Sequence, residues 1–107
     1  MQFGLKEEVI DNICKVFSSF KEIEKVVIYG SRARGNYKNG SDIDLTLFGE
    51  GLNLYVINKI DLQLDELYLP YTFDLSIFNR ISNPDLISHI QRIGKVFYSR
   101  KVNCKNI

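Results

Sequence analysis

Apolar residues recur at three- and four-residue spacing in three stretches, and this spacing predicts three amphipathic helices. The first covers residues 5–20 and the second covers residues 53–68, each with charged residues on its other face. The third begins at Asn83-Pro84, because proline favours the first position of a helix. We expect it to end at Gly94, in the left-handed conformation that glycine adopts readily at helix ends.

Four other stretches have the β-branched, aromatic or alternating residues that are typical of strands. They cover residues 26–29, 42–48, 73–78 and 96–98, the last as a short edge strand. In the second stretch, polar and apolar side chains alternate and therefore point to opposite faces of the sheet. The polar face carries Asp42, Asp44 and Thr46, and the apolar face carries Ile43, Leu45 and Leu47.

The order of these elements predicts an α+β fold with a small mixed sheet. About a dozen residues join the first two strands, with room for one helical turn starting at Ser31, and such a short connection favours antiparallel pairing. A full helix joins the second strand to the third, which favours a parallel crossover. The end of the first strand and the starts of the other two then share one edge of the sheet.

Length and composition indicate one globular domain over residues 1–107, with about 101–107 as a flexible tail. The net charge of +1 gives no overall field to attract nucleic acid, and no apolar run is long enough to span a membrane. Cys14 and Cys104 are far apart in the sequence and match no metal-binding spacing. No secretory signal is visible, so we expect a cytoplasmic protein.

Three aspartates are expected at the shared edge of the sheet. Asp42 and Asp44 are two residues apart on one strand face, about 6.5 Å along the strand, and Asp74 lies on the next strand. Carboxylates this close repel one another unless a cation lies between them. Ligand sets made only of oxygen favour Mg²⁺ or Mn²⁺, and two such ions would suit phosphoryl displacement.

The loop before these aspartates has features of a phosphate-binding turn. Gly30 allows close approach of the backbone, and Ser31 with the following N–H groups could hold phosphates. Arg32 and Arg34 are candidates for contacts with a triphosphate, although a loop arginine is often simply exposed. Lys38 could reach phosphate or lie in solvent. His89, in the last predicted helix, is expected to be a surface or packing residue.

The segments GSRARG, SDIDL, FDLSIF and IGKVFY together resemble the polymerase-β-like nucleotidyltransferase superfamily over nearly the whole chain. They are most similar to the minimal nucleotidyltransferases, the MntA-type antitoxins of HEPN–MNT pairs. The resemblance implies a two-layer nucleotidyltransferase fold of order αββαβα, with Mg²⁺ bound by Asp42, Asp44 and Asp74 and ATP phosphates held by Gly30 and Ser31. It further implies transfer of AMP to a tyrosine of a HEPN ribonuclease toxin.

The short chain leaves little surface for binding an acceptor, so a protein partner or an oligomer is expected to supply it. In that reaction, Asp74 is the best-placed residue to help deprotonate the acceptor hydroxyl. Two other functions fit the same residues. The chain could be an antitoxin that acts only by forming a complex, or a small-molecule nucleotidyltransferase completed by a separate subunit.

Overall fold

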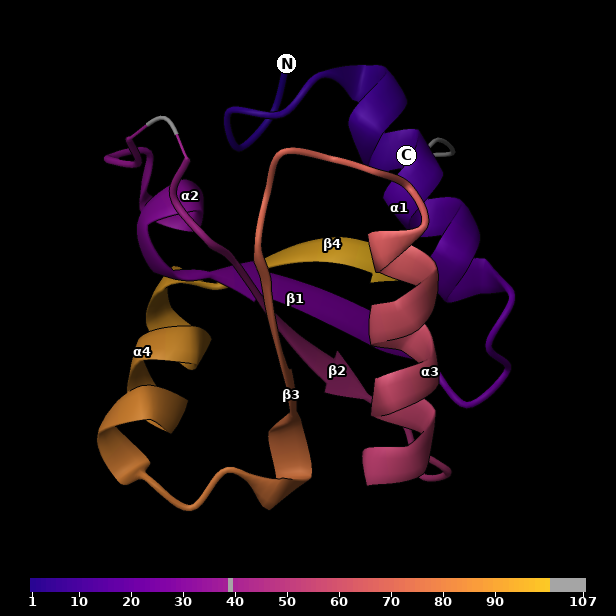
Figure 1. Cartoon of the computed structure of the whole chain (residues 1–107). Helices are drawn as coiled ribbons and strands as arrows, with labels where there is room; N and C mark the ends of the chain where they lie inside the picture. The colour runs from indigo at the N-terminus through magenta and orange to yellow at the C-terminus, as the bar shows by residue number, and fades with distance from the viewer. Residues whose placement is uncertain (39, 101–107) are drawn as a thin grey trace.

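The computed structural model describes residues 1–38 and 40–100, which form four α-helices and a four-stranded sheet (Figure 1). The expected tail at 101–107 lies outside the described residues. The elements in chain order are α1 (Glu7–Ser18), β1 (Lys25–Tyr29), α2 (Gly30–Arg34), β2 (Ile43–Phe48), α3 (Leu54–Asp65), β3 (Phe73–Ile77), a 3₁₀ turn (Phe78–Arg80), α4 (Pro84–Ile93) and β4 (Lys95–Ser99). No helix in these ranges is both long and apolar enough to cross a membrane.

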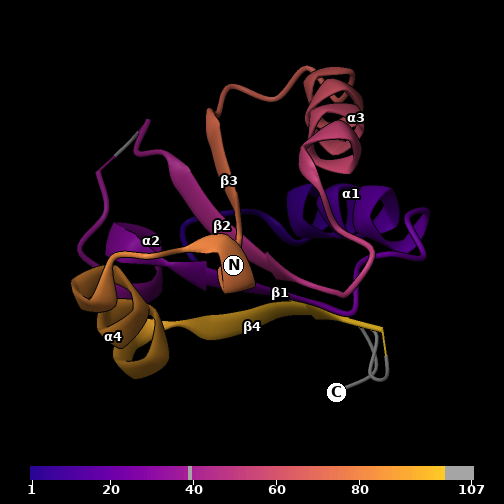
Figure 2. The same cartoon turned by 90° about the horizontal axis from the view of Figure 1, so that it is seen from below.

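The sheet has the strand order β3-β2-β1-β4, which Figure 2 shows from below. β1 is antiparallel to both β2 and β4, whereas β2 and β3 are parallel. The α+β class, the mixed sheet and the edge position of the last strand are confirmed. The parallel pairing follows from α3, which carries the chain back across one face of the sheet between β2 and β3.

Helices cover the two faces of the sheet unequally. α1 and α3 lie on one side and α4 lies on the other (Figure 1). The first side contains the main core, in which Ile28, Leu45 and Leu47 are fully buried. The second side contains a smaller cluster formed by Val27 and Tyr29 of β1 with Ile90 of α4. Because α4 covers only part of this second face, the rest of it is available for polar side chains.

Gly94 ends α4, but the expected left-handed conformation is wrong. Its backbone is extended, with φ −60° and ψ 146°, and the chain passes directly into β4. Glycine is needed here because of close packing. A Cβ atom at this position would overlap the carbonyl oxygen of Ile90 and lie 2.6 Å from Cγ1 of Val27. Gly94 therefore lets α4 lie close to β1.

We expect Gly94→Ala to lower the free energy of unfolding by about 1–3 kcal/mol, because the added methyl group overpacks the contact between α4 and β1. Urea unfolding followed by circular dichroism would measure this loss. Gly51→Ala is the matched control, since its Cβ would meet only the flexible side chain of Glu22, with the nearest atom at 3.1 Å. Equal stabilities of the two variants would contradict the packing argument.

Candidate active site

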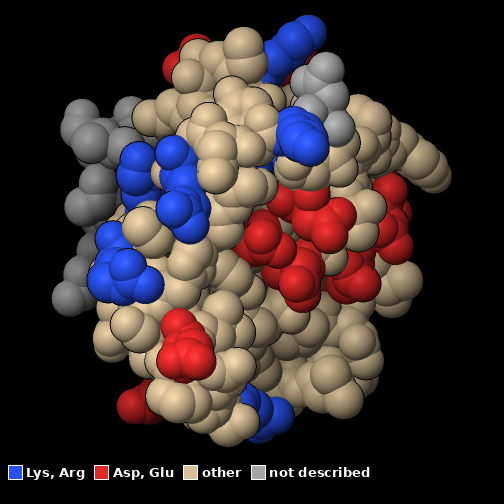
Figure 3. All heavy atoms as spheres, turned by 90° about the vertical axis from the view of Figure 1, so that its left-hand side faces the viewer, with Lys and Arg blue, Asp and Glu red and all other residues tan. Residues whose placement is uncertain are grey.

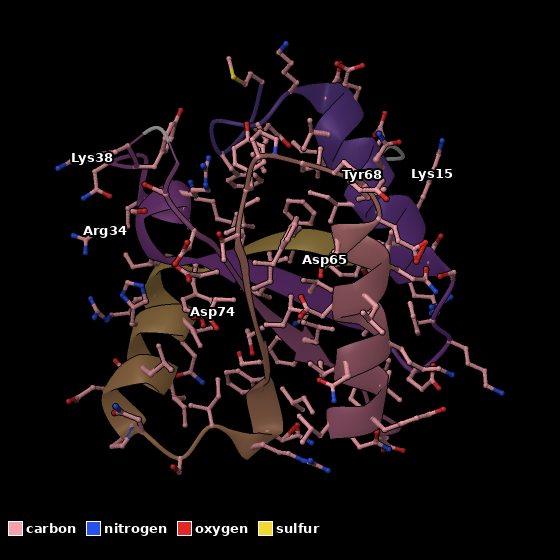
Figure 4. The ribbon with its side chains drawn as sticks, viewed as in Figure 1. Lys15, Arg34, Lys38, Asp65, Tyr68 and Asp74 are labelled. Carbon is pink, nitrogen blue, oxygen red and sulfur yellow. The ribbon has the colours of Figure 1, made fainter. Side chains whose placement is uncertain are left out.

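Three carboxylates lie at the rim where β1 ends and β2 and β3 begin. Asp44 of β2 is paired on one side with Asp74 of β3 and on the other with Tyr29 of β1. Paired residues on neighbouring strands are about 5 Å apart, so the two aspartates are direct neighbours. Asp42 is exposed immediately before β2, and Asp74 extends from β3 on the side of the sheet where α4 lies (Figure 4). The structure thus brings all three together, and their catalytic roles stay a prediction.

Negative charge is concentrated at this rim. Burial raises the pKa of Asp44 above its ordinary value, and the charges of Asp74 and then Asp42 raise it further. His89 opposes these effects and lowers the pKa of Asp44. Acidic side chains form a patch on the molecular face that Figure 3 shows, with basic side chains on other parts of that face. A group held in such a field is stabilised by a bound cation.

Tyr29 places a phenol group in the same field. Burial raises the pKa of its hydroxyl, a hydrogen bond with Ser76 opposes the rise, and the charges of Asp74 and Asp44 add to it. The hydroxyl of Tyr29 therefore stays protonated at neutral pH. It can act as a hydrogen-bonding group beside the carboxylates but not as a base.

Gly30 connects the carboxylates to the loop. Its φ of +75° lies in the left-handed region that favours glycine, and a Cβ atom there would overlap Oδ2 of Asp44. Its N–H group donates a hydrogen bond to Nε2 of His89 at 3.2 Å. The Gly30-Ser31 turn thus lies directly against one of the three carboxylates, so that a phosphate at the turn would also be close to any cation held there.

Arg32 does not face the site as a phosphate ligand would. It is only 3% exposed, and its Nε and Nη2 groups donate to the carbonyl oxygen of Ser41 at 3.1 and 2.9 Å. Nη1 donates to the carbonyl oxygen of Phe3 at 2.9 Å. The rings of Tyr37 and Tyr71 lie 5.3 and 5.0 Å from its guanidinium carbon. The expectation that Arg32 binds phosphate is therefore replaced by a structural role, in which it ties the loop to the N-terminal segment.

Arg34 and Lys38 are exposed and project away from the sheet beside α2 (Figure 4). Neither side chain has a hydrogen-bond partner recorded among the described residues, although the backbone N–H of Lys38 donates to Oγ of Ser41 at 2.8 Å. With Arg32 turned inward, these two residues are the cations of the loop that could move toward a bound triphosphate. Contact between Arg34 and phosphate stays a prediction.

His89 is a site residue that the sequence pattern did not identify. Helical spacing places it on α4, but nothing in the sequence shows that α4 crosses the end of β1. Its contact with Gly30 joins residues 59 positions apart. The sequence feature that could have indicated its place is its position next to Ile90, a residue of the apolar stripe of this helix. In the structure, Ile90 packs against Tyr29.

The chemistry of the carboxylates fits Mg²⁺. Within the described ranges, no group of three or more His, Cys, Asp or Glu side chains is placed to hold a metal ion by itself. Mg²⁺ is usually bound by one or two carboxylates together with substrate phosphates and water, so a complete protein cage is not required. Burial and the charges of Asp74 and Asp42 raise the pKa of Asp44, and a bound divalent cation would stabilise its ionised form.

Comparisons with known proteins give a family match for most of the chain. Residues 11–103 match the family described as polymerase beta, nucleotidyltransferase. No curated protein sequence matches the chain. The sequence match covers α2 and all four strands, so it includes every candidate residue at the rim.

Several solved structures have a similar fold. A toxin–antitoxin complex with AMP-PNP has a TM-score of 0.68 and 18% identity, and the alignment covers 86% of this chain and 74% of that one. The complex of tri-AMPylated HEPN toxin with MNT antitoxin from Shewanella oneidensis has a TM-score of 0.64 and 15% identity, with 91% and 75% covered. An MntA–HepT complex has a TM-score of 0.65 and 15% identity, with 90% and 74% covered. At these identities, the likeness establishes the fold alone.

We expect Arg32→Lys to lower the free energy of unfolding by about 2–3 kcal/mol, because lysine cannot reproduce the three hydrogen bonds of the buried guanidinium group. Urea unfolding would measure the loss. Arg34→Lys makes the same exchange at an exposed position of the same helix, and we expect a change within about 0.5 kcal/mol. A similar small effect in both variants would show that the buried hydrogen bonds of Arg32 add no stability.

We expect Asp44→Asn to raise the midpoint of thermal unfolding at neutral pH without metal. Folding raises the pKa of Asp44, so the folded chain binds the proton of this carboxyl group more tightly than the unfolded chain does. The free energy of unfolding therefore falls as pH rises from the pKa of the unfolded state to that of the folded state. The variant removes this loss, and Mg²⁺ should stabilise the wild-type chain more than the variant. Thermal scans across pH, with and without Mg²⁺, would test both effects.

The control for this prediction is Glu50→Gln, which removes one exposed carboxylate from the loop after β2. We expect the control to show the pH dependence and the Mg²⁺ response of the wild-type chain. A lower unfolding midpoint for Asp44→Asn at neutral pH would mean that repulsion at the rim does not destabilise the fold.

Proposed function

Because the chain belongs to the polymerase beta nucleotidyltransferase family, we propose that it transfers AMP from ATP to a hydroxyl group of a partner protein. The family match confirms the resemblance seen in the sequence, and the protein is a nucleotidyltransferase. The observation that carries the proposal is the pairing of Asp44 with Asp74 directly beside Gly30. This arrangement supports a phosphate-binding turn and an acidic cluster that act on one substrate.

Each residue at the rim has a role in this proposal. Asp42, Asp44 and Asp74 would hold Mg²⁺, which supplies positive charge for an in-line displacement at phosphorus when it is bound. The Gly30-Ser31 turn orients the phosphates through the N–H groups of Ser31 and the residues that follow it and through the hydroxyl of Ser31. Arg34 approaches the triphosphate from solvent and balances part of its charge.

The transfer itself needs one proton acceptor. The acceptor oxygen forms a bond to the α-phosphorus while the bond from this phosphorus to pyrophosphate breaks. The carboxylate of Asp74 takes the proton of the attacking hydroxyl, because it is exposed at the edge strand, where an acceptor can approach. Pyrophosphate then leaves from the side of the Gly30-Ser31 turn.

The proposed acceptor is a tyrosine of a HEPN toxin, and the chain would act as its antitoxin in the cytoplasm. Support comes from the fold shared with toxin–antitoxin complexes, one of which contains a tri-AMPylated HEPN toxin. Asp42 and Asp74 are exposed at the carboxylate rim, so a partner protein can present its hydroxyl there. Residues 1–107 would form a single nucleotidyltransferase domain, and an oligomer that includes the toxin is consistent with this function.

A second candidate function is neutralisation by complex formation without chemistry. It is favoured by exposed apolar side chains on α3, where Leu54, Tyr55 and Leu62 are 67%, 69% and 64% exposed. Such residues are suited to a protein interface. This surface lies on a different element from the carboxylates, so binding and transfer can be separated by mutation.

We expect Asp42→Asn/Asp44→Asn to reduce AMP transfer by at least about a hundredfold, because loss of cation binding removes several kcal/mol of transition-state stabilisation. Incubation with labelled ATP, Mg²⁺ and the toxin encoded beside the gene would measure transfer. Glu7→Gln/Glu8→Gln is a control that removes two exposed carboxylates from α1, away from both the rim and α3, and should leave transfer unchanged.

The same variants separate the two candidate functions. If the Asp42/Asp44 variant loses transfer and also fails to neutralise the toxin, the catalytic function is supported. Full neutralisation by that variant would instead support complex formation alone. Undiminished label on the toxin would show that these two aspartates are not the catalytic carboxylates.

A further inference from the structure

The helix α4 contacts the candidate nucleotide-binding turn through His89. Nε2 of this residue accepts the hydrogen bond from the N–H group of Gly30 at 3.2 Å. Its ring also lies against Tyr29 in an edge-to-face arrangement, with the centroids 6.1 Å apart and an angle of 80° between the planes. His89 therefore contacts both residues at the junction of β1 and α2.

Gly30 is restricted on two sides, by His89 and by Asp44. The first N–H groups of a helix have no acceptor within the helix, and here the first one is bound by an imidazole. On its other side, the Cα atom of Gly30 lies against the carboxylate of Asp44. The peptide group of Gly30 is held between His89 and Asp44, and its orientation determines where Ser31 and the next N–H groups point.

The position of His89 depends on the packing of α4. Ile90, the next residue, is 4% exposed and packs against Val27 and Tyr29. Gly94 allows the end of the helix to approach β1 closely. α4 is therefore fixed to the sheet near His89, and a change in this packing would be transmitted to the Gly30-Ser31 turn.

We propose that His89 is a positioning residue for nucleotide binding, which holds the amide of Gly30 so that the Gly30-Ser31 turn is already shaped to receive phosphates. This inference rests on the proposed function. His89 itself does not need to touch the nucleotide. Its effect is on affinity, because a turn that is already ordered loses less conformational entropy when the phosphates bind.

Two substitutions of His89 distinguish the effect of its hydrogen-bond acceptor from the effect of its aromatic ring. His89→Phe keeps an aromatic ring against Tyr29 and removes the acceptor, whereas His89→Gln keeps an acceptor oxygen on a flexible side chain. Gln91→Ala, at an exposed position of α4, is the control. Each chain would be studied by calorimetry with ATP and Mg²⁺, and by amide hydrogen exchange at Gly30.

We expect His89→Phe to weaken nucleotide binding by about two- to tenfold, which corresponds to the loss of one hydrogen bond. Exchange at the Gly30 amide should become faster, and the KM for ATP should rise more than kcat falls. His89→Gln should recover part of the affinity and of the exchange protection, and Gln91→Ala should match the wild-type chain. Equal or tighter binding by His89→Phe would overturn the proposal, because His89 would then be neutral or would block the turn.

The same measurements distinguish failure of the proposed function from failure of the positioning role alone. If the wild-type chain takes up no ATP with Mg²⁺, the proposed nucleotidyl transfer is wrong, and the proposed role of His89 in nucleotide binding is wrong with it. If the wild-type chain binds ATP but exchange at Gly30 is the same in His89→Phe, only the positioning role is overturned.

Discussion

The candidate active site depends on the side-by-side placement of two like charges, Asp44 and Asp74, on parallel strands. Aspartate is a poor strand former, and like charges opposite each other destabilise a sheet. The fold nevertheless holds them together, since each aspartate alternates with buried or partly buried apolar residues that fix the register. A shift by one residue would move Asp44 into the main core, where an unpaired carboxylate could not remain. The core thus stabilises an acidic site that is unfavourable by itself.

Much of this arrangement could be predicted from the sequence, because it depends on periodicity and connection length. The alternation around Asp42 and Asp44 gives the strand face, and the helix between β2 and β3 gives the parallel pairing that places Asp74 beside Asp44. The glycine at position 30 could also be anticipated from the turn. These features are local in sequence or follow from general rules of connection between strands.

The roles of Arg32, His89 and Gly94 could not be predicted, because each depends on a partner without a sequence signature. Arg32 donates to two backbone carbonyl groups, His89 accepts from a backbone N–H group, and Gly94 lies against a carbonyl oxygen. Every residue has a carbonyl group, so the sequence does not show which one a side chain will meet. Spacing identified the carboxylates, but only the three-dimensional path of the chain shows what holds the turn.

The inward position of Arg32 changes how a triphosphate can be bound. Its three hydrogen bonds tie the loop to Ser41 and Phe3, so its charge serves the shape of the loop. In the proposed function, phosphate charge would then be balanced by a cation at the carboxylates, by N–H groups of the turn and by exposed residues such as Arg34. An ordered turn therefore matters more than it would in a site where an arginine side chain contacts the phosphates directly. This requirement gives the contact between Gly30 and His89 its importance, since the hydrogen bond between them orders the turn.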